Sequence, residues 1–167
     1  MRLFDFSTPG AADLWYAIND GVMGGVSQGA LRATGEGTAE FTGRVSLEND
    51  GGFASVRSRD GRHDLGWASG IELRVRGDGR RYKINLKIDP SFGGILYRAA
   101  FPARAGEWQT QRLPFADFEP SFRGGIVRGA SPLDPSSVRS VGLMISDRQA
   151  GPFRLEIAWI DAYHDGP

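Results

Sequence analysis

Three short segments hold most of the polar groups whose type and spacing suit recognition of a ligand. The first, residues 15–27, contains Asn19 and Asp20 together with three glycines, and the segments 49–57 and 77–82 repeat this association of polar side chains with glycine. Glycine tolerates positive φ and close approach of the backbone, so such segments form shaped loops. The chemistry they favour is hydrogen bonding to a partner through amide, carboxylate and guanidinium groups.

The candidate binding residues lie in these loops or in the strands expected beside them. They are Asn19, Asp20, Met23, Asn49, Arg57, Asp78, Arg80, Tyr82 and Trp108. Four of them have a structural alternative: Asp78 and Arg80 could stabilise their own turn, Met23 could fill a gap in the core, and Trp108 could be an ordinary core residue. A salt bridge between Arg57 and Asp78 would be compatible with both interpretations.

Catalytic chemistry has weaker support. His63 and His164 are the only histidines and lack the spacing of a zinc site, and no serine occupies a Gly-x-Ser-x-Gly turn. The loop acids Asp20, Asp78 and Asp147 could serve glycoside hydrolysis if two of them lay roughly 5–10 Å apart. Aspartate beside glycine more often bonds its own backbone. We therefore predict no catalytic residue, metal or cofactor and keep carboxylate catalysis as a minor alternative; a structural calcium stays an open question.

The composition excludes further classes of protein. The 20 basic and 20 acidic residues cancel, whereas nucleic-acid-binding proteins need a basic excess. Cysteine is absent, which excludes disulfides and thiolate chemistry. No apolar run approaches the roughly 18 residues of a membrane span, and the first residues have no secretory apolar region. We expect a cytoplasmic protein with one domain over residues 1–167, which binds no nucleic acid and does not insert into a membrane.

Apolar and polar residues alternate with a period of two, which is typical of strands with one buried face. The clearest runs are 71–76, 81–88 and 153–159, and further strands are expected at 30–33, 38–47, 52–58, 96–102, 108–113 and 138–146. The glycines at 77 and 79 predict a hairpin of 71–76 with 81–88. Helical turns are expected at 114–118 and 134–137, and residues 119–135 form the longest irregular stretch. About nine strands indicate an all-β fold, an antiparallel β-sandwich of the jelly-roll kind.

Several blocks of the sequence resemble the complex I intermediate-associated protein 30 family. They are Trp15 with residues 19–27, residues 41–43 with 45–49, residues 51–57, residues 77–80 with Tyr82, Trp108 with residues 113–115 and Phe118, residues 122–124, and residues 141–147 with 151–153. The blocks follow the family's order and cover nearly the whole chain. The resemblance implies a galactose-binding-like jelly roll, akin to family 11 carbohydrate-binding modules.

The resemblance also implies a function. Eukaryotic relatives serve as assembly factors for respiratory complex I in mitochondria, and this chain, without a targeting segment, is expected to be a stand-alone bacterial member. We expect a non-enzymatic, chaperone-like domain that engages a protein partner through the three loops, such as a respiratory-complex subunit or assembly intermediate. The alternative is a carbohydrate- or small-ligand-binding module.

Overall fold

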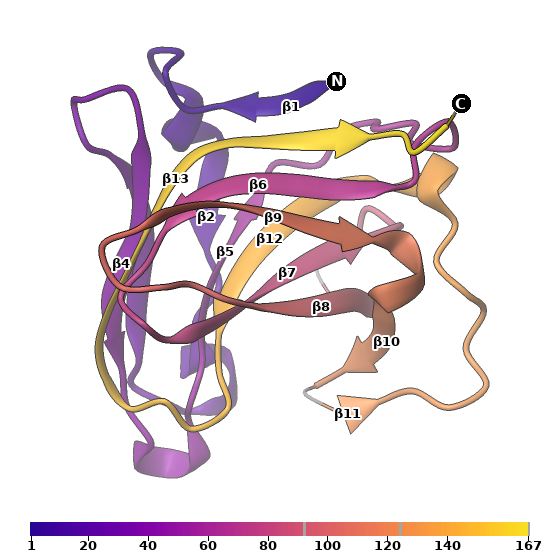
Figure 1. Ribbon diagram of the computed structural model, residues 1–167. Coiled ribbons are helices and arrows are strands. Elements are labelled where there is room, and N and C mark those ends of the chain that lie inside the picture. Colours follow the sequence, from indigo (N-terminus) through magenta and orange to yellow (C-terminus); the bar gives the residue numbers. More distant parts are fainter. Residues whose placement is uncertain (92, 124, 167) are drawn as a thin grey trace.

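The computed structural model describes residues 1–91, 93–123 and 125–166, and within these ranges the protein is built from strands and short 3-10 helices (Figure 1). The strands are β1 (Arg2–Asp5), β2 (Trp15–Ala17), β3 (Gln28–Ala33), β4 (Ala39–Val45), β5 (Ala54–Ser58), β6 (Gly70–Arg76), β7 (Arg81–Lys87), β8 (Leu96–Pro102), β9 (Trp108–Pro114), β10 (Glu119–Phe122), β11 (Gly125–Ile126), β12 (Ser140–Ile145) and β13 (Gly151–Tyr163). The helices are η1 (Ala11–Leu14), η2 (Asp20–Met23), η3 (Glu48–Asp50), η4 (Phe115–Asp117) and η5 (Pro135–Ser137). In these ranges no helix is long and apolar enough to cross a membrane.

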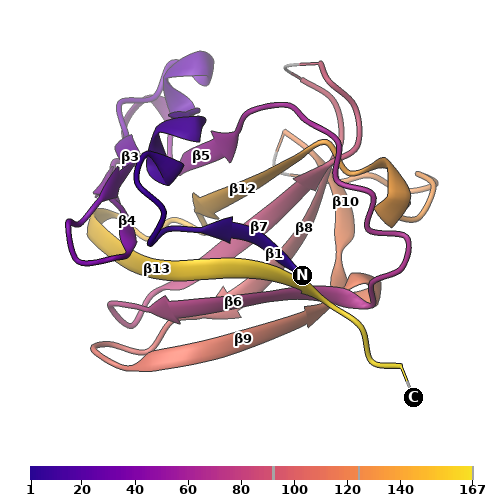
Figure 2. The same cartoon turned by 90° about the horizontal axis from the view of Figure 1, so that it is seen from above.

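The strands form two antiparallel sheets that pack face to face (Figure 2). A six-stranded sheet has the order β3-β4-β13-β6-β9, and β1 pairs with the far half of β13. A seven-stranded sheet has the order β11-β10-β8-β7-β12-β5-β2. The predicted all-β sandwich is therefore confirmed.

The core lies between the sheets because each strand turns its alternate apolar residues inward. Ile71, Leu73 and Val75 of β6 and Ile84 and Leu86 of β7 are all 0% exposed and belong to one hydrophobic cluster. Burial of each such side chain is worth about 1.5–3 kcal/mol. The residues between them point outward, so each sheet also has an outer face that carries the polar side chains.

The predicted hairpin of 71–76 with 81–88 is wrong. β6 pairs with β13 and β9 in one sheet, whereas β7 pairs with β12 and β8 in the other, so the turn at 77–80 carries the chain across the sandwich. Alternation requires only that one face of each strand is buried, and two strands that face each other across a core satisfy it as well as two neighbours do.

The irregular stretch predicted at 119–135 contains the strands β10 and β11, which pair with each other at the edge of the seven-stranded sheet. The strands β1 and β2 were also not predicted, because they are short and lack a long alternating run. The two expected helical turns are present as η4 and η5, and the Asp134 carboxylate caps η5 by accepting the Ser136 amide at 3.1 Å.

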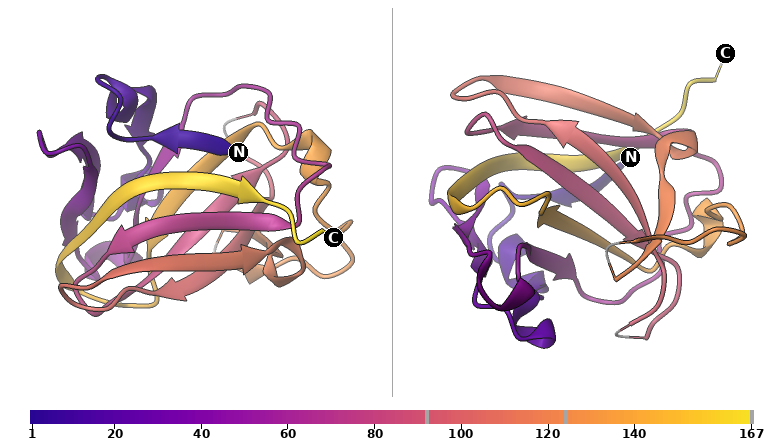
Figure 3. Two further views of the ribbon diagram at one scale, coloured as in Figure 1. Left: turned by 45° about the horizontal axis from the view of Figure 1, so that its top comes forward. Right: turned by 90° about the horizontal axis from the view of Figure 1, so that it is seen from below.

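The two ends of the chain lie together at one end of the sandwich (Figure 3). The amino group of Met1 donates to the carbonyl of Ala162 at 2.8 Å, and Arg2 lies opposite Asp161. The start of β13, at Gly151, lies at the opposite end, where the predicted binding loops are found.

Candidate partner-binding surface

Four connections meet at the end of the sandwich away from the chain termini. They are residues 18–27 between β2 and β3, residues 46–53 between β4 and β5, residues 77–80 between β6 and β7, and residues 146–150 between β12 and β13; Figure 1 shows them at the lower left. We call this set of connections the rim. The register places them together: Ala17 lies opposite Val56, and Gly151 lies opposite Val45.

A buried carboxylate joins the first two connections. Asp20 is 0% exposed, and it accepts hydrogen bonds from the Ser27 amide (2.8 Å) and hydroxyl (2.6 Å) and from the amides of Gly52 (2.7 Å) and Phe53 (3.3 Å). Burial alone would raise the pKa of Asp20, but these hydrogen bonds outweigh it and hold the pKa below its usual value. The lowered pKa is the reverse of what a general acid at neutral pH requires.

Two glycines allow the loops to close around Asp20. A Cβ on Gly25 or on Gly51 would overlap the Asp20 carboxyl group, so only glycine fits at both positions. The association of polar side chains with glycine, noted in the sequence, thus has a packing cause: the carboxylate needs backbone amides from two segments within hydrogen-bond distance.

Asn19 connects the two sheets. Its Nδ2 donates to the carbonyl of Gly29 on β3 at 3.3 Å, and its Oδ1 accepts the amide of Ser55 on β5 at 3.2 Å. The Ser55 hydroxyl in turn donates to the carbonyl of Ile18. Asn19 and Asp20 therefore hold the rim in shape with groups that point into the protein.

The third connection is built around Asp78. Its carboxylate accepts the Arg80 amide (3.1 Å), the Tyr82 hydroxyl (2.9 Å) and the Arg154 amide (2.8 Å), and Arg80 Nε lies 3.8 Å away. Tyr82 is fully buried, and burial together with the Asp78 charge raises the pKa of its phenol. Among the described residues the ion pair of Asp78 is with Arg80. Arg57, the partner considered from the sequence, lies on β5, on the outer face of the seven-stranded sheet.

The connection between β12 and β13 lies between the second and third loops. Arg80 Nη1 donates to the carbonyl of Gln149 at 3.1 Å, which attaches the third loop to it. Asp147 (φ 61°) and Arg148 (φ 57°) both adopt left-handed backbone conformations without glycine, which is costly for such residues. A shallow depression separates this connection from the second loop; its lining is Arg44, Val45, Ser46, Leu47, Glu48, Ala150 and Gly151.

The remaining predicted residues occupy different places. Asn49 is exposed on the rim with φ 56°. The side chain of Met23 lies outside the described residues. Trp108 lies on the outer face of the six-stranded sheet, with the guanidinium carbons of Arg76 and Arg74 at 5.1 and 5.9 Å from its ring centroid, and is not a core residue.

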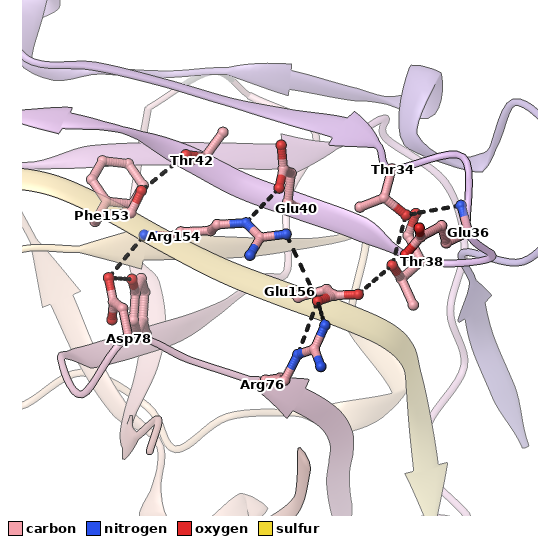
Figure 4. Close-up of polar contacts among 11 residues, drawn as sticks. Thr34, Glu36, Thr38, Glu40, Thr42, Arg76, Asp78, Phe153, Arg154 and Glu156 are labelled. Carbon is pink, nitrogen blue, oxygen red and sulfur yellow. Dashed lines mark hydrogen bonds and ion pairs between the residues drawn. The ribbon is translucent and has the colours of Figure 1, made fainter. Parts of the chain in front are cut away.

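The outer face of the six-stranded sheet carries a cluster of paired charges on β4, β6 and β13 (Figure 4). Glu156 on β13 is 4% exposed and accepts Arg76 Nη2 at 2.6 Å and Thr38 Oγ1 at 2.7 Å. Arg154 donates to Glu40 on β4 at 2.6 Å. Burial would raise the pKa of Glu156, but the bonds from Thr38 and Arg76 hold it below its usual value.

Residues missed by sequence reasoning lie on the outer face of the seven-stranded sheet. Lys83, Asn85 and Arg98 project from β7 and β8, and Arg57 on β5 is the one predicted residue that shares this face. A signal was present: Lys83 and Lys87 are the only lysines in the chain, and both belong to this face. The alternating pattern of 81–88 alone assigns them only to the polar half of a strand.

The residues considered for catalysis and metal binding lie apart in the described part of the chain. No three His, Cys, Asp or Glu side chains in it are grouped so that they could hold a metal ion. His63 lies half-buried beside Phe4, with ring centroids 5.9 Å apart, and burial lowers its pKa. Desolvation and an aromatic neighbour suit a structural histidine.

The fold defines a β-sandwich of the kind found in carbohydrate-binding modules. The family 11 carbohydrate-binding module of a cellulosomal cellulase of Clostridium thermocellum superposes with a TM-score of 0.70 at 16% sequence identity, over 98% of this chain and 94% of that one. Identity this low shows the fold alone.

The sequence identifies the family. Residues 4–157 match the family described as Complex I intermediate-associated protein 30 (CIA30), and the chain belongs to it. The mitochondrial protein of that name from Drosophila melanogaster is 30% identical over 98% of this chain and 62% of its own length. The one from Mus musculus is 31% identical over 92% of this chain and 53% of its own length. The chain thus spans little more than half of the curated relatives it matches, and the family predicted from its sequence blocks is confirmed.

Proposed function

We propose that this chain is a non-enzymatic protein-binding domain that assists the assembly of a respiratory complex, and that the rim is part of its contact surface. The family supports the assembly role, because its relatives are named complex I intermediate-associated protein 30. The cytoplasmic location expected from the sequence belongs to the same proposal.

The observation that carries the proposal is the buried Asp20 carboxylate. It fixes two loops of the rim before any partner arrives, so binding does not have to order them. Preorganisation of this kind lowers the entropic cost of association. The Asp20 carboxylate of the rim is engaged in internal hydrogen bonds and is not free to act on a substrate. A surface built in this way suits recognition better than catalysis.

The exposed residues of the rim and its border would make the contacts. Val26 is 48% and Tyr16 is 43% exposed, Asn49 is exposed, and the Arg80 side chain keeps 28% of its area in solvent. Protein interfaces combine apolar, aromatic and arginine side chains in this way.

The test is genetic and uses the full chain in its own organism. Loss of the gene should lower the amount of assembled complex I several-fold on native gels, and the wild-type gene should restore it. A Val26→Asp, Asn49→Arg variant should fail to restore assembly. The matched control is Arg112→Gln, which lies on the outer face of the six-stranded sheet and should restore it. Both variants must unfold at the wild-type temperature. Unchanged complex I after loss of the gene would contradict the proposal.

A carbohydrate is the second candidate, favoured by the shared fold and by the half-exposed ring of Tyr16. A solved family 11 module holds a β-1,3-1,4-mixed-linked tetrasaccharide. That sugar, at 100 times its dissociation constant, would stabilise the folded chain by about 2.7 kcal/mol. A panel of oligosaccharides without any thermal shift would exclude this candidate.

A further inference from the structure

The strand β9 forms one edge of the six-stranded sheet and lies at the margin of the molecule (Figure 2). It pairs with β6 in one unbroken register, and among the described residues it has no second neighbour. Just past the strand, the Phe115 amide donates to the Ser69 carbonyl at 3.0 Å. Because the backbone groups of antiparallel strands alternate in direction, the groups that face β6 are those of residues 109, 111 and 113. The N–H and C=O groups that face the open side are those of Trp108, Thr110 and Arg112.

Nothing in the described part of the chain covers these backbone groups. None of them has a hydrogen-bond partner there, and the side chains of the same residues lean the other way, over β6. The ring of Trp108 and the hydroxyl of Thr110 both lie beside Arg74, at 5.9 Å and 3.3 Å. The guanidinium of Arg112 lies 3.3 Å from Glu72. The edge is therefore open to a further strand.

This edge also lacks the features that normally keep an edge strand unpaired. Such features are a bulge, a proline within the strand, a charged side chain that points inward, or a covering loop. The register of β9 with β6 has no bulge, and its one proline is the last residue. Its inward-facing residues carry no charge; they are Gln109, Gln111 and Leu113.

A second copy of β9 matches the edge along its whole length. Antiparallel pairing about a two-fold axis at Thr110 places Thr110 opposite itself and Trp108 opposite Arg112 of the second copy. Each facing pair exchanges two hydrogen bonds, so all the open groups of both copies are paired and no like charges lie opposite each other. The ladder ends there, because Pro114 has no N–H and the Gly106 amide already donates within its own chain, to Gly77 at 3.1 Å.

We propose that this chain forms a two-fold dimer through β9, in which the two six-stranded sheets join into one continuous sheet. A closed two-fold contact covers both open edges at once. An extended segment of another protein could bond to the edge, but a copy of the strand brings open groups of the same number and spacing. The ladder uses main-chain groups alone, so the ion pairs of Arg112 with Glu72 and Asp165 stay as they are. The dimer does not depend on the proposed assembly role.

The first experiment measures the molar mass of the full chain by analytical ultracentrifugation over a dilution series. The wild type should rise from 18.1 kDa to twice that mass with concentration. Thr110→Pro removes the N–H at the centre of the ladder from both copies and should raise the dissociation constant about 10- to 100-fold. Within one copy that N–H bonds nothing, so a proline is tolerated there.

The matched control is a proline at the opposite edge of the same sheet, on β3. The amide of Ala33 faces away from β4, because the next amide, that of Thr34, bonds the Thr38 carbonyl at 3.0 Å. Ala33→Pro should therefore fold and dimerise like the wild type.

The second experiment uses the absence of cysteine from the chain. Thr110→Cys would place two thiols at the two-fold axis with their Cα atoms about 5.5 Å apart, which a disulfide can bridge. Mild oxidation should therefore link this variant into a covalent dimer. Arg112→Cys tests the register, since its two Cα atoms would lie about 13 Å apart, four residues along the strand, and should not be linked.

A wild type that stays monomeric at every concentration would overturn the proposal. So would a Thr110→Pro variant that dimerises like the wild type at an unchanged unfolding temperature, since the contact would then lie elsewhere. Equal cross-linking of Thr110→Cys and Arg112→Cys would overturn it as well. If Thr110→Pro does not fold, the two cysteine variants decide.

Discussion

Glu156 on the outer face of the six-stranded sheet lies between Thr38 and the guanidinium of Arg76, whereas Arg98 on the outer face of the seven-stranded sheet has an amide as its partner. Both side chains are largely withdrawn from water. Glu156 is neutralised by a guanidinium of the protein itself. Arg98, in the described part of the chain, has no acid within ion-pair distance. The comparison teaches that equal numbers of acids and bases in a chain do not imply that its two faces are alike.

The largest expected effect is at Asp20, because this residue joins two loops that each connect a strand of one sheet to a strand of the other. Asp20→Asn replaces one acceptor oxygen with an amide that confronts the donors of Ser27, Gly52 and Phe53. We expect a loss of about 3 kcal/mol in the free energy of unfolding, measured with urea. The exposed Asp13→Asn is the control, and an equal effect in both variants would contradict the role of Asp20.

The same residue predicts how acid acts on the fold. The folded-state pKa of Asp20 is lowered, so its stabilisation is complete above the unfolded-state pKa of about 3.9 and is lost as the pH falls through the folded-state pKa. The difference in unfolding free energy between wild type and Asp20→Asn should therefore shrink below about pH 4. A difference that stays constant from neutral pH into this acid range would show that the Asp20 charge does not matter.

A smaller effect is expected at Glu156, on the outer face of the six-stranded sheet. Glu156→Gln should cost about 2 kcal/mol, because the side chain at this buried position loses the charge that accepts from Arg76. Glu72→Gln is the matched change at an exposed pair, where Arg112 also contacts Asp165 at 2.8 Å, and should cost about 0.5 kcal/mol. Urea unfolding of both variants measures the two losses. If they are equal, burial does not distinguish the charges of this face.

The smallest effect sharpens the contrast between the faces. Arg98→Met should leave the free energy of unfolding within about 1 kcal/mol of the wild type, with any change toward greater stability, because it removes a desolvated charge that has no acid partner. The measurement is again urea unfolding. A loss as large as that of Glu156→Gln would mean that Asn85 satisfies Arg98 fully, and the two faces would then be equivalent.

Much of the fold could be predicted from the sequence, because the alternation of apolar and polar residues is a pattern within each single strand. A half-buried strand must alternate, so the runs at 71–76, 81–88 and 96–102 mark strands whatever their partners are. The pairing of those strands depends on the path of the chain between sheets, which alternation does not encode. For this reason the strands were found and the hairpin between the first two was not.

The site was less predictable, because the direction of a polar group depends on distant partners. Asp20 was expected to present its carboxylate outward, but the amides that bind it include those of Gly52 and Phe53, which are more than thirty positions away. Arg98 gave no signal at all. Its significance lies in the residue opposite it on β7, and only the register of the two strands reveals that neighbour.

The amino group of Met1 bonds to Ala162 at the end of the sandwich remote from the rim. A short linker joining the original ends would make a circular permutant, with new ends opened in an exposed connection such as 104–107. An affinity handle or fluorescent protein attached at either end of this sequence would lie away from the proposed contact surface. Surface immobilisation through that end would present every molecule in the same orientation to a partner.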